Sequence, residues 1–435
     1  MVVRGPVLAL VLLGVVPVVL WPGSAGTVAA LWLAGVALLV LLDAALTPSP
    51  RTVGLERSPD PQVRLGEPAA STLTLTNPGT RRLRGMVRDA WVPSAGAADP
   101  RHTLDLPAGE RRRVTTTLVP VRRGERAAVG VTVRLHGPLG LAGRQATTPV
   151  PGVVRSLPPF RSRAQLPSRL ARLREIDGRS AVRTRGQGTE FDSLRDYVEG
   201  DDVRSIDWRA TARRQHVVVR TWQPERDRRV VIVLDTSRTG AARVGDEPRL
   251  DAAMDAALLL AALAERAGDR VDLVAGDRVV RARAGSGTGS SRAPLLHAMV
   301  TAMAPLEPQL VEADWTTLAG AVVGLTRRRA LVVLLTPLEP AAVEQGLLPA
   351  LPTLTAHHRV VLASVADPAL SRLRQDLSSV ERVYDAAAAE RAGALRHRTA
   401  AALARLGVSV VDEPPAVLPG ALADHYLELK AKGLL

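Results

Sequence analysis

The sequence predicts an α/β protein built from two N-terminal transmembrane helices, a small β-sandwich and a doubly wound domain with a parallel sheet. Three observations carry this prediction. Two apolar runs occupy residues 1–50, short alternating β-branched runs occupy residues 51–150, and apolar strand patterns alternate with helical patterns over residues 228–413. A chain of 435 residues is long enough for two or three domains that each bury a core of their own.

The N-terminal region predicts two membrane-spanning helices. Apolar runs cover residues 7–21 and about 27–42, with a Pro-Gly-Ser break between them. The first run is near the lower length limit for a span, and a cleaved signal peptide is the competing interpretation, because Arg4 would supply its basic start. Arg4 before the runs and Arg51 and Arg57 after them predict that both ends lie in the cytoplasm. We therefore expect a multi-pass protein of the bacterial cell membrane, and with either interpretation the soluble domains face the cytoplasm.

Residues 51–150 predict a small, immunoglobulin-like β-sandwich. Runs such as 71–77 and 127–135 alternate polar with apolar residues and are rich in β-branched side chains, which is typical of strands with one buried face. Turns of Gly, Pro and Asn separate the runs. Because the region offers no nucleophile, base or metal cluster, we expect a packing or interaction module.

Residues 228–413 predict the doubly wound domain. The run at 228–237 is nearly continuous in apolar residues, as in a strand that is buried on both faces. Further strands are expected at 271–276, 330–336, 359–365 and 408–411, with helical patterns between them. Alternating strands and helices demand a parallel sheet that is covered on both sides. Residues 414–435 predict a final amphipathic helix.

The segment 151–227 links the two domains and carries the densest pattern in the chain. After a Pro-rich exit and an Arg-studded helical pattern, aromatic, glycine and oppositely charged residues crowd together where an ordinary linker would carry Ser, Gly and Pro. The residues singled out are Gly188, Glu190, Phe191, Arg195, Tyr197, Gly200, Asp201, Asp202, Asp207, Trp208 and Arg213. Buried charges need partners, and the segment supplies both signs, so we interpret it as a structural junction or a partner-docking segment.

Asp235, Ser237 and Thr239 come at the end of the first predicted strand of the doubly wound domain. In an open parallel sheet, ligands bind beyond the carboxyl ends of the strands. One carboxylate and two hydroxyls at this spacing are hard oxygen ligands of the kind that Mg²⁺ accepts. Thr316 and Thr317 are candidates for a further hydroxyl ligand from a later loop. The competing interpretation is that Asp235 caps the next turn and Ser237 bonds the backbone.

Composition excludes several classes of function. The chain has no Cys, which excludes disulfides, thiol catalysis and Cys-ligated zinc. Its only Lys residues are Lys430 and Lys432, so no Lys-bearing phosphate loop exists, and no G-x-S-x-G elbow is present. The net charge of +14 would favour nucleic acid or an anionic membrane surface, but charges of both signs are mixed and few aromatic residues accompany them. We therefore expect no nucleic-acid partner.

The order and spacing of residues in the central segment are specific to a family. They are Gly188, Glu190, Phe191, Leu194, Arg195, Tyr197, Gly200, Asp201, Asp202, Arg204, Ile206, Asp207, Trp208, Ala212, Arg213, Val219, Arg220 and Glu225. With the apolar runs and the downstream domain, this pattern closely resembles the domain of unknown function 58 family of membrane-anchored bacterial proteins. The segment from His136 to Leu141 resembles, less closely, a segment whose sequence in the family is often Asp-Pro-Phe-Gly-Leu. The resemblance implies a partner of the MoxR type of AAA+ ATPase and brings no settled catalytic activity.

The loop from Asp235 to Thr239 resembles the D-x-S-x-S loop of the metal-ion-dependent adhesion site in von Willebrand factor A domains. Thr239 replaces the second Ser, and Thr336-Pro337-Leu338 stands where a later Asp is expected. Losing that carboxylate removes a charge that would orient metal-bound water. The resemblance therefore implies a von Willebrand A-like domain with a degenerate site, for which Mg²⁺ is the one candidate cofactor.

Together these observations predict a membrane-anchored, cytoplasm-facing adaptor that binds a partner protein and is not an enzyme. Two alternatives of other classes stay open. A divalent-metal-dependent hydrolase would use the carboxylates of Glu190, Asp201, Asp202 and Asp207, although the adjacent Arg side chains argue against an open metal site. An Arg-driven binder of nucleic acid or anionic lipid would lose affinity steeply as salt is added.

Overall fold

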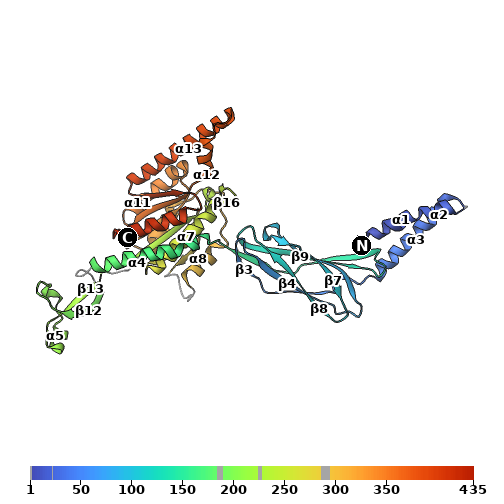
Figure 1. Ribbon diagram of the computed structural model, residues 1–435, viewed down its shortest axis with the longest axis horizontal. Coiled ribbons are helices and arrows are strands. Elements are labelled where there is room, and N and C mark those ends of the chain that lie inside the picture. The colour runs from blue at the N-terminus through green and yellow to red at the C-terminus, as the bar shows by residue number, and fades with distance from the viewer. Residues whose placement is uncertain (1, 22, 184–189, 224–227, 286–293) are drawn as a thin grey trace. The chain divides into compact units, whose positions relative to one another are not determined.

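The computed structural model describes residues 2–21, 23–183, 190–223, 228–285 and 294–435. The chain divides into two compact units, Met1–Leu157 and Pro158–Leu435. Both are drawn in Figure 1, and each is described here by itself. Helices and sheets are both abundant, which confirms the predicted α/β class at this level.

The first unit begins with apolar helices. They are α1 (Gly5–Leu13), α2 (Val15–Leu20) and α3 (Ala25–Leu46). Within the described part of the chain, one helical stretch, Ala25–Thr52, is long and apolar enough to cross a membrane, as judged by length and composition alone. Gly5–Leu20 is apolar but shorter, so the prediction of two spans is supported for one helix. The indole Nε1 of Trp32 donates a hydrogen bond of 2.9 Å to the carbonyl of Leu10, which ties α3 to α1.

Two facing sheets form the rest of the first unit. The larger contains β1 (Val2–Val3), β3 (Gln62–Arg64), β5 (Leu83–Trp91), β7 (Arg101–Leu106), β9 (Gly124–His136), β10 (Ala142–Thr148) and β11 (Val153–Leu157). The smaller contains β2 (Gly54–Arg57), β4 (Ala69–Thr76), β6 (Ala97–Ala98) and β8 (Arg111–Leu118). Along β4 every second residue is buried, as the alternating sequence predicts, and Leu73 and Leu75 pack against Val87 and Leu104 of the other sheet. The core therefore lies between the sheets, and β11 carries the unit to Leu157 through its pairing with β9 and β3.

A buried carboxylate joins α3 to the larger sheet. Asp43 is fully buried near the end of α3, and its two oxygens accept hydrogen bonds of 2.8 Å from the backbone N–H groups of Leu139, Leu141 and Ala142. Leu139 and Leu141 lie in the turn between β9 and β10, and Ala142 begins β10. A Cβ on Gly137 would lie 2.1 Å from Asp43 Oδ1, so only glycine allows this approach. The apolar helix and the sandwich are therefore locked together through one side chain.

The second unit is built on a six-stranded sheet. In spatial order its strands are β18 (Val280–Gly285), β17 (Arg270–Gly276), β14 (Arg229–Asp235), β19 (Leu331–Leu335), β20 (Arg359–Val365) and β21 (Ser409–Glu413). All neighbours pair in parallel except β17 and β18. The central strands are apolar and buried along their length, as expected for a sheet that is covered on both faces. The expected parallel sheet is thus present, with β18 as an antiparallel edge that the sequence did not reveal.

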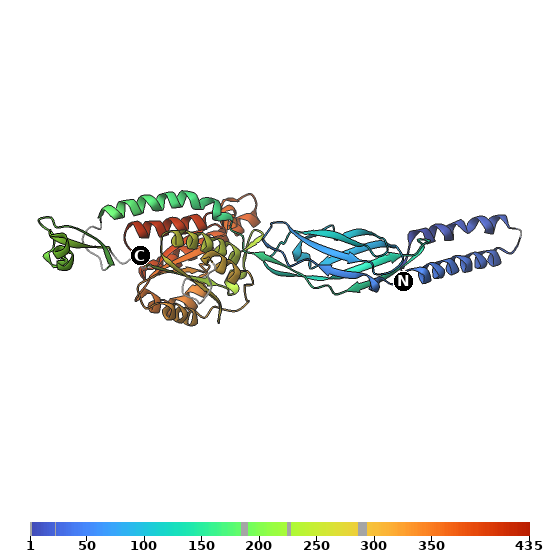
Figure 2. The same ribbon diagram turned by 90° about the horizontal axis from the view of Figure 1, so that it is seen from below.

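Helices cover both sides of this sheet (Figure 2). They are α4 (Leu166–Arg183), α7 (Arg249–Arg266), α8 (Leu295–Met303), α9 (Trp315–Leu325), α11 (Leu348–Thr355), α12 (Pro368–Gln375), α13 (Val380–Arg405) and α14 (Leu418–Ala431). On one face, α7 is buried almost throughout and packs against α4 and α14. The predicted C-terminal helix, α14, is docked there: the hydroxyl of Tyr426 donates a hydrogen bond of 2.5 Å to Asp269, and the ammonium of Lys430 lies 3.2 Å from the same carboxylate.

An antiparallel hairpin lies between α4 and β14 in the sequence. Its strands are β12 (Glu190–Asp196) and β13 (Val218–Gln223), and its tip holds a 3₁₀ turn (Val203–Ser205) and the helix α5 (Trp208–Arg214). We call residues 190–223 the arm. Most of the singled-out residues of the central segment lie in it, whereas Gly188 and the side chains of Glu190 and Phe191 lie outside the described part of the chain.

The buried carboxylate of Asp43 gives a first prediction. Asp43→Ala leaves three N–H groups without their acceptor, which should cost roughly 3 kcal/mol locally, since hydrogen bonds to a charged group are the stronger kind. Hydrogen exchange of the full chain in detergent micelles should then speed up at the amides of Leu139, Leu141 and Ala142. The matched control is Asp105→Ala, which removes a carboxylate from a solvent-exposed ion pair and should leave these amides unchanged. Unaltered protection in Asp43→Ala would contradict the locking role.

Candidate functional site

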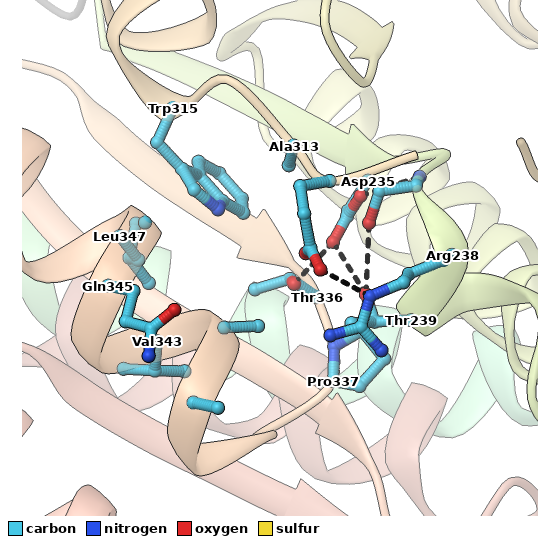
Figure 3. Close-up of a pocket in the computed structure, with 15 residues that line it drawn as sticks. Asp235, Arg238, Thr239, Ala313, Trp315, Thr336, Pro337, Val343, Gln345 and Leu347 are labelled. Carbon is cyan, nitrogen blue, oxygen red and sulfur yellow. Dashed lines mark hydrogen bonds and ion pairs between the residues drawn. The ribbon is translucent and has the colours of Figure 1, made fainter. Parts of the chain in front are cut away.

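The cavity that contains the predicted loop lies at the carboxyl ends of β14 and β19 (Figure 3). Its volume is about 250 Å³. Its polar lining comes from Asp235, Ser237, Arg238, Thr239, Glu312, Thr336 and Gln345, and its apolar lining includes Ala313, Trp315, Pro337, Val343 and Leu347. The position agrees with the expectation that an open parallel sheet binds ligands beyond its strand ends.

Asp235 is the centre of the hydrogen bonds in this cavity. It is only 3% exposed, and one oxygen accepts the backbone N–H of Ser237 at 2.8 Å. The other oxygen accepts the hydroxyl of Thr239 at 3.1 Å and that of Thr336 at 2.6 Å (Figure 3). The hydroxyls of Ser237 and Thr239 lie 3.1 Å apart. The structure therefore brings Asp235, Ser237 and Thr239 together and adds Thr336, which directly follows β19 and precedes Pro337, the residue that stands in place of the expected Asp.

Thr316 and Thr317, the other candidate ligands, take part in a different interaction. The carboxylate of Asp314 caps α9 by accepting the backbone N–H groups of Thr316 and Thr317 at 3.0 and 3.1 Å. It also accepts the hydroxyl of Thr317 at 2.6 Å, and these bonds hold the pKa of Asp314 below its usual value. Neither threonine lines the cavity of Asp235. They begin a helix there, which is the ordinary role of such a sequence.

A second carboxylate supports the loop from the neighbouring strand. Asp277 follows β17 and is fully buried; it accepts the hydroxyl of Thr236 at 2.8 Å and pairs with Arg281. Burial alone would raise the pKa of Asp277. The bonds from Arg281, Thr236 and the backbone of Arg278 outweigh burial and hold that pKa below its usual value. The loop after β14 is therefore fixed on both sides, by Asp277 and by Thr336.

The rim of the cavity carries one ion pair. Arg238 pairs with Glu312, and the two side chains are 50% and 56% exposed. Hydrogen bonding to Glu312 is the main reason that the pKa of Arg238 is raised. Behind the rim, Trp315 is 4% exposed and closes the wall between α9 and the segment 340–347. The cavity thus combines a floor built around one hydrogen-bonded carboxylate with a guanidinium that solvent reaches.

The donor set does not fit a bound Mg²⁺. The described residues hold no group of three or more His, Cys, Asp or Glu side chains that could bind a metal ion. The cavity supplies one carboxylate on its floor, and that carboxylate already accepts three hydrogen bonds from the chain. Magnesium is usually held by one or two carboxylates whose oxygens are open to it. The interpretation of Asp235 as a cap for its own turn therefore describes the geometry better than a metal ligand.

The acidic residues of the arm are engaged separately from one another. Asp201 forms a two-pronged pair with Arg195 at 2.7 and 2.5 Å, which keeps the pKa of Asp201 below its usual value. Asp207 caps α5 through the N–H groups of Arg209 and Ala210 and pairs with Arg220 at 2.8 Å. The bond from Ala210, followed by that from Arg220, likewise lowers the pKa of Asp207.

Asp202 and Gly200 complete the tip of the arm. Asp202 accepts the N–H of Arg204 at 3.0 Å and so begins the 3₁₀ turn. Gly200 has a φ of +106°, a conformation that a side chain would strain. The described carboxylates of the arm therefore do not converge on one point, and their contacts are those of a folded hairpin.

Fold and cavity together define the class: a mixed α/β protein with a β-sandwich unit and a polar cavity at the carboxyl edge of a parallel sheet. Residues 193–409 match the family described as "Protein of unknown function DUF58", so the family resemblance seen in the sequence is confirmed for this part of the chain.

Relatives with curated sequences have names that assign no activity. Uncharacterized proteins of Mycobacterium bovis and of two strains of Mycobacterium tuberculosis are each 28% identical to this chain over 184 residues. The match covers 42% of this chain and 56% of each relative, so the chain spans little more than half the length of the relatives it matches. Among solved structures, the CARDB domain of a Pyrococcus furiosus protein, in complex with di-metal ions, is 14% identical. It covers 22% of this chain and 90% of its own, with a TM-score of 0.16, which is too low to carry an argument.

The role of Thr336 yields a second prediction. Thr336→Asp places a second carboxylate against Asp235, and the two charges repel unless a cation or a proton lies between them. This variant should unfold at a lower temperature in chelator and recover at least part of that loss in millimolar Mg²⁺. The natural chain should show the same unfolding temperature in both solutions, and Thr336→Val serves as the control that removes the hydroxyl without adding charge. An equal stabilisation of the natural chain by Mg²⁺ would contradict the assignment of Asp235 as a cap.

Proposed function

We propose that this chain is a membrane-anchored adaptor whose soluble domains face the cytoplasm and whose α/β domain binds a partner protein at the cavity beside Asp235. The partner that the family resemblance favours is a AAA+ ATPase of the MoxR type. The apolar stretch Ala25–Thr52 supports the anchor, and Arg51 and Arg57 at its end favour a cytoplasmic orientation. A first span over residues 5–20 would make the anchor multi-pass.

The observation that carries the proposal is the state of the cavity floor. The side-chain oxygens that could act in catalysis there are already hydrogen-bonded within the chain. Asp235 accepts three hydrogen bonds, two of which come from the hydroxyls of Thr239 and Thr336. A nucleophile or general base needs a free lone pair directed at a substrate. A preformed polar cavity without such a group is suited to recognition.

Arg238 is the group that we expect to meet the partner. Its pair with Glu312 is exposed to water, and exposed pairs contribute little net stability, so the pair exchanges readily. A carboxylate of the partner that replaces Glu312 would be shielded from water by the partner itself, which strengthens the charge-assisted bond. Arg238 would thereby supply the positive charge that a metal ion supplies in an intact adhesion site.

The order of the sheet and the loop after β14 favour a von Willebrand A-like domain with a degenerate adhesion site. The hydrolase alternative is less favoured, because Asp201 and Asp207 are each engaged by an Arg side chain. The nucleic-acid alternative is also less favoured, since Arg238 sits beside Glu312 in a narrow cavity and not on an open basic stripe.

The proposal predicts that Arg238→Glu lowers affinity for the purified ATPase at least tenfold, because the rim would then carry two like charges. The measurement is a pulldown with the detergent-solubilised full chain, run once in Mg²⁺ and once in chelator, with equal capture expected in both. Arg283→Glu, an exposed Arg on the edge strand β18, is the control of equal charge change and should bind normally. Normal capture by Arg238→Glu would refute the role of the cavity. Metal-dependent turnover by the purified chain that is lost in Asp202→Ala would favour the hydrolase.

A further inference from the structure

The tip of the arm presents an exposed face that the rest of the arm does not cover. Trp208 is 69% exposed, and Val203 and Val198 nearby are 64% and 61% exposed. A large aromatic side chain rarely stays in water without a reason, because burying one removes on the order of 200 Å² of mostly apolar surface from water. The tip therefore has the character of a contact surface.

The geometry of α5 gathers basic residues beside Trp208. At about 100° per residue, positions 208, 209, 212 and 213 share one side of the helix. The opposite side holds Ala210 and Thr211, which are half-buried, and the hydroxyl of Thr211 accepts the N–H of Val218 at 3.1 Å. The outward side therefore joins an indole ring to the guanidinium groups of Arg209 and Arg213.

The arginines of the arm divide into two sets. Arg195 and Arg220 pair with Asp201 and Asp207 and stabilise the hairpin. A second set forms no ion pair with any described residue; it comprises Arg204, Arg209, Arg213 and Arg214. Two of them, Arg209 and Arg213, share the outward side of α5 with Trp208, and cations beside an exposed indole call for an occupant that is acidic and partly apolar.

A cavity of this complementary kind lies in the α/β domain of the same chain. It has a volume of about 600 Å³ and lies beside the ends of β20 and β21, among α12, α13 and α14. Leu338, Leu370 and Val410 give it apolar walls. Its size is that of a typical binding pocket and is ample for one aromatic side chain and its neighbours.

The charge of this second cavity is negative. Two of its carboxylates are neutralised within the domain: Asp412 pairs with Arg396 at 2.5 Å, and Asp424 pairs with Arg169 at 2.9 Å. Its other cation, Arg374, lies 3.4 Å from Glu390. The lining carboxylates that form no ion pair with a described residue are Asp367, Glu413 and Glu428. His397 and His425 also line the cavity, and burial, the main cause, lowers the pKa of His425, which favours its neutral form.

We propose that the tip of the arm of one copy of this chain docks in the carboxylate-lined cavity of a second copy. Trp208 would fill the apolar part of the cavity, and Arg209 and Arg213 would meet Glu413 and Glu428. This contact is independent of the partner site at Asp235, because it uses a different cavity and different residues.

Chain connectivity favours a second copy over the same chain. β13 ends at Gln223, and Arg228 leads into the amino end of β14, so the base of the arm belongs to the amino edge of the sheet. The carboxylate-lined cavity lies at the carboxyl edge, where β20 and β21 end. Docking of each arm in the other copy buries two equivalent contacts and closes a two-fold dimer.

Because the natural chain contains no Cys, thiol cross-linking can test this contact without background. One full-length chain carries Arg213→Cys and a second, differently tagged, carries Glu428→Cys; the two are co-expressed, purified in detergent and treated with a short bismaleimide. We expect a cross-linked dimer that contains both tags. The control replaces Glu428→Cys with Glu381→Cys, which lies near the start of α13 and about 18 Å along that helix from Gly393, the first residue of α13 that lines the cavity. This pair should not cross-link.

A charge exchange supplies the second measurement. Arg209→Glu with Arg213→Glu should weaken the dimer at least tenfold, as measured by sedimentation in detergent, and so should Glu413→Arg with Glu428→Arg. Mixing the two variants should restore both contacts of the dimer, because each arm then finds a cavity of opposite charge. All four positions are on the surface of the arm or at the cavity, so far-ultraviolet circular dichroism should be unchanged.

Three results would overturn the proposal. The first is cross-linking at monomer mass in one chain that carries both Cys residues, with none between separate chains, because it would place the arm in its own cavity. The second is a monomeric natural chain at all accessible concentrations. The third is weakening by either pair of substitutions without recovery on mixing, which would point to an acidic partner of another kind.

Discussion

Parallel pairing of β14, β17, β19, β20 and β21 is the constraint on which the rest of the second unit depends. Strands that run in one direction bring all their carboxyl ends to one edge, and the chain must turn there after every strand. Asp235, Asp277, Thr336, Asp367 and Glu413 come from five different strand ends and meet along that edge. Both cavities described above open on it. Polar chemistry is concentrated there because the remainder of the sheet is apolar and covered by helices.

Buried carboxylates have the same physical role in both units. Asp43, Asp235 and Asp277 are each at most 3% exposed, and each accepts at least three hydrogen bonds from its own chain. A buried charge without such bonds would be strongly unfavourable, so each cluster of donors is held in one arrangement. In the first unit this fixes a helix to a sheet, and in the second it fixes the loop after β14. Stability is thereby obtained from groups that in other contexts would serve as ligands or bases.

The sequence alone predicted the elements whose structure follows from hydrophobic periodicity. It did not predict features that depend on contacts between residues far apart in the chain. The apolar runs of β14, β19 and β20, and the alternation in β4, are read directly from residue order. The antiparallel strand β18 is half exposed and Arg-rich, so its pattern lacks the apolar continuity of a central strand. Asp43 interrupts an apolar run, and the sequence around it does not indicate its hydrogen-bond donors, which lie 96 to 99 residues away. The segment Thr336-Pro337-Leu338 was noted for Pro337, which stands in place of an expected Asp, yet the neighbouring hydroxyl of Thr336 is what bonds Asp235. Thr316 and Thr317 show the limit of residue type as a guide: their hydroxyls suit a metal, but in the structure their backbone N–H groups bond the nearer Asp314, which caps α9.

The family-specific residues of the arm fall into two groups, those that stabilise the hairpin and those that are exposed at its tip. This division explains why so many charged, aromatic and glycine residues occur together in the segment. Arg195, Asp201, Asp207 and Gly200 stabilise a small hairpin, in which Val218 and Val219 are the buried apolar residues among the side chains that the structure describes. Two strands and a seven-residue helix are marginal in water, so ion pairs, caps and a glycine with positive φ add to the little that apolar burial supplies. Trp208 and the arginines outside these pairs are exposed, and those arginines form no ion pair with a described residue. A hairpin that needs so much local support to hold up an exposed aromatic and basic face is best explained by selection for what that face contacts.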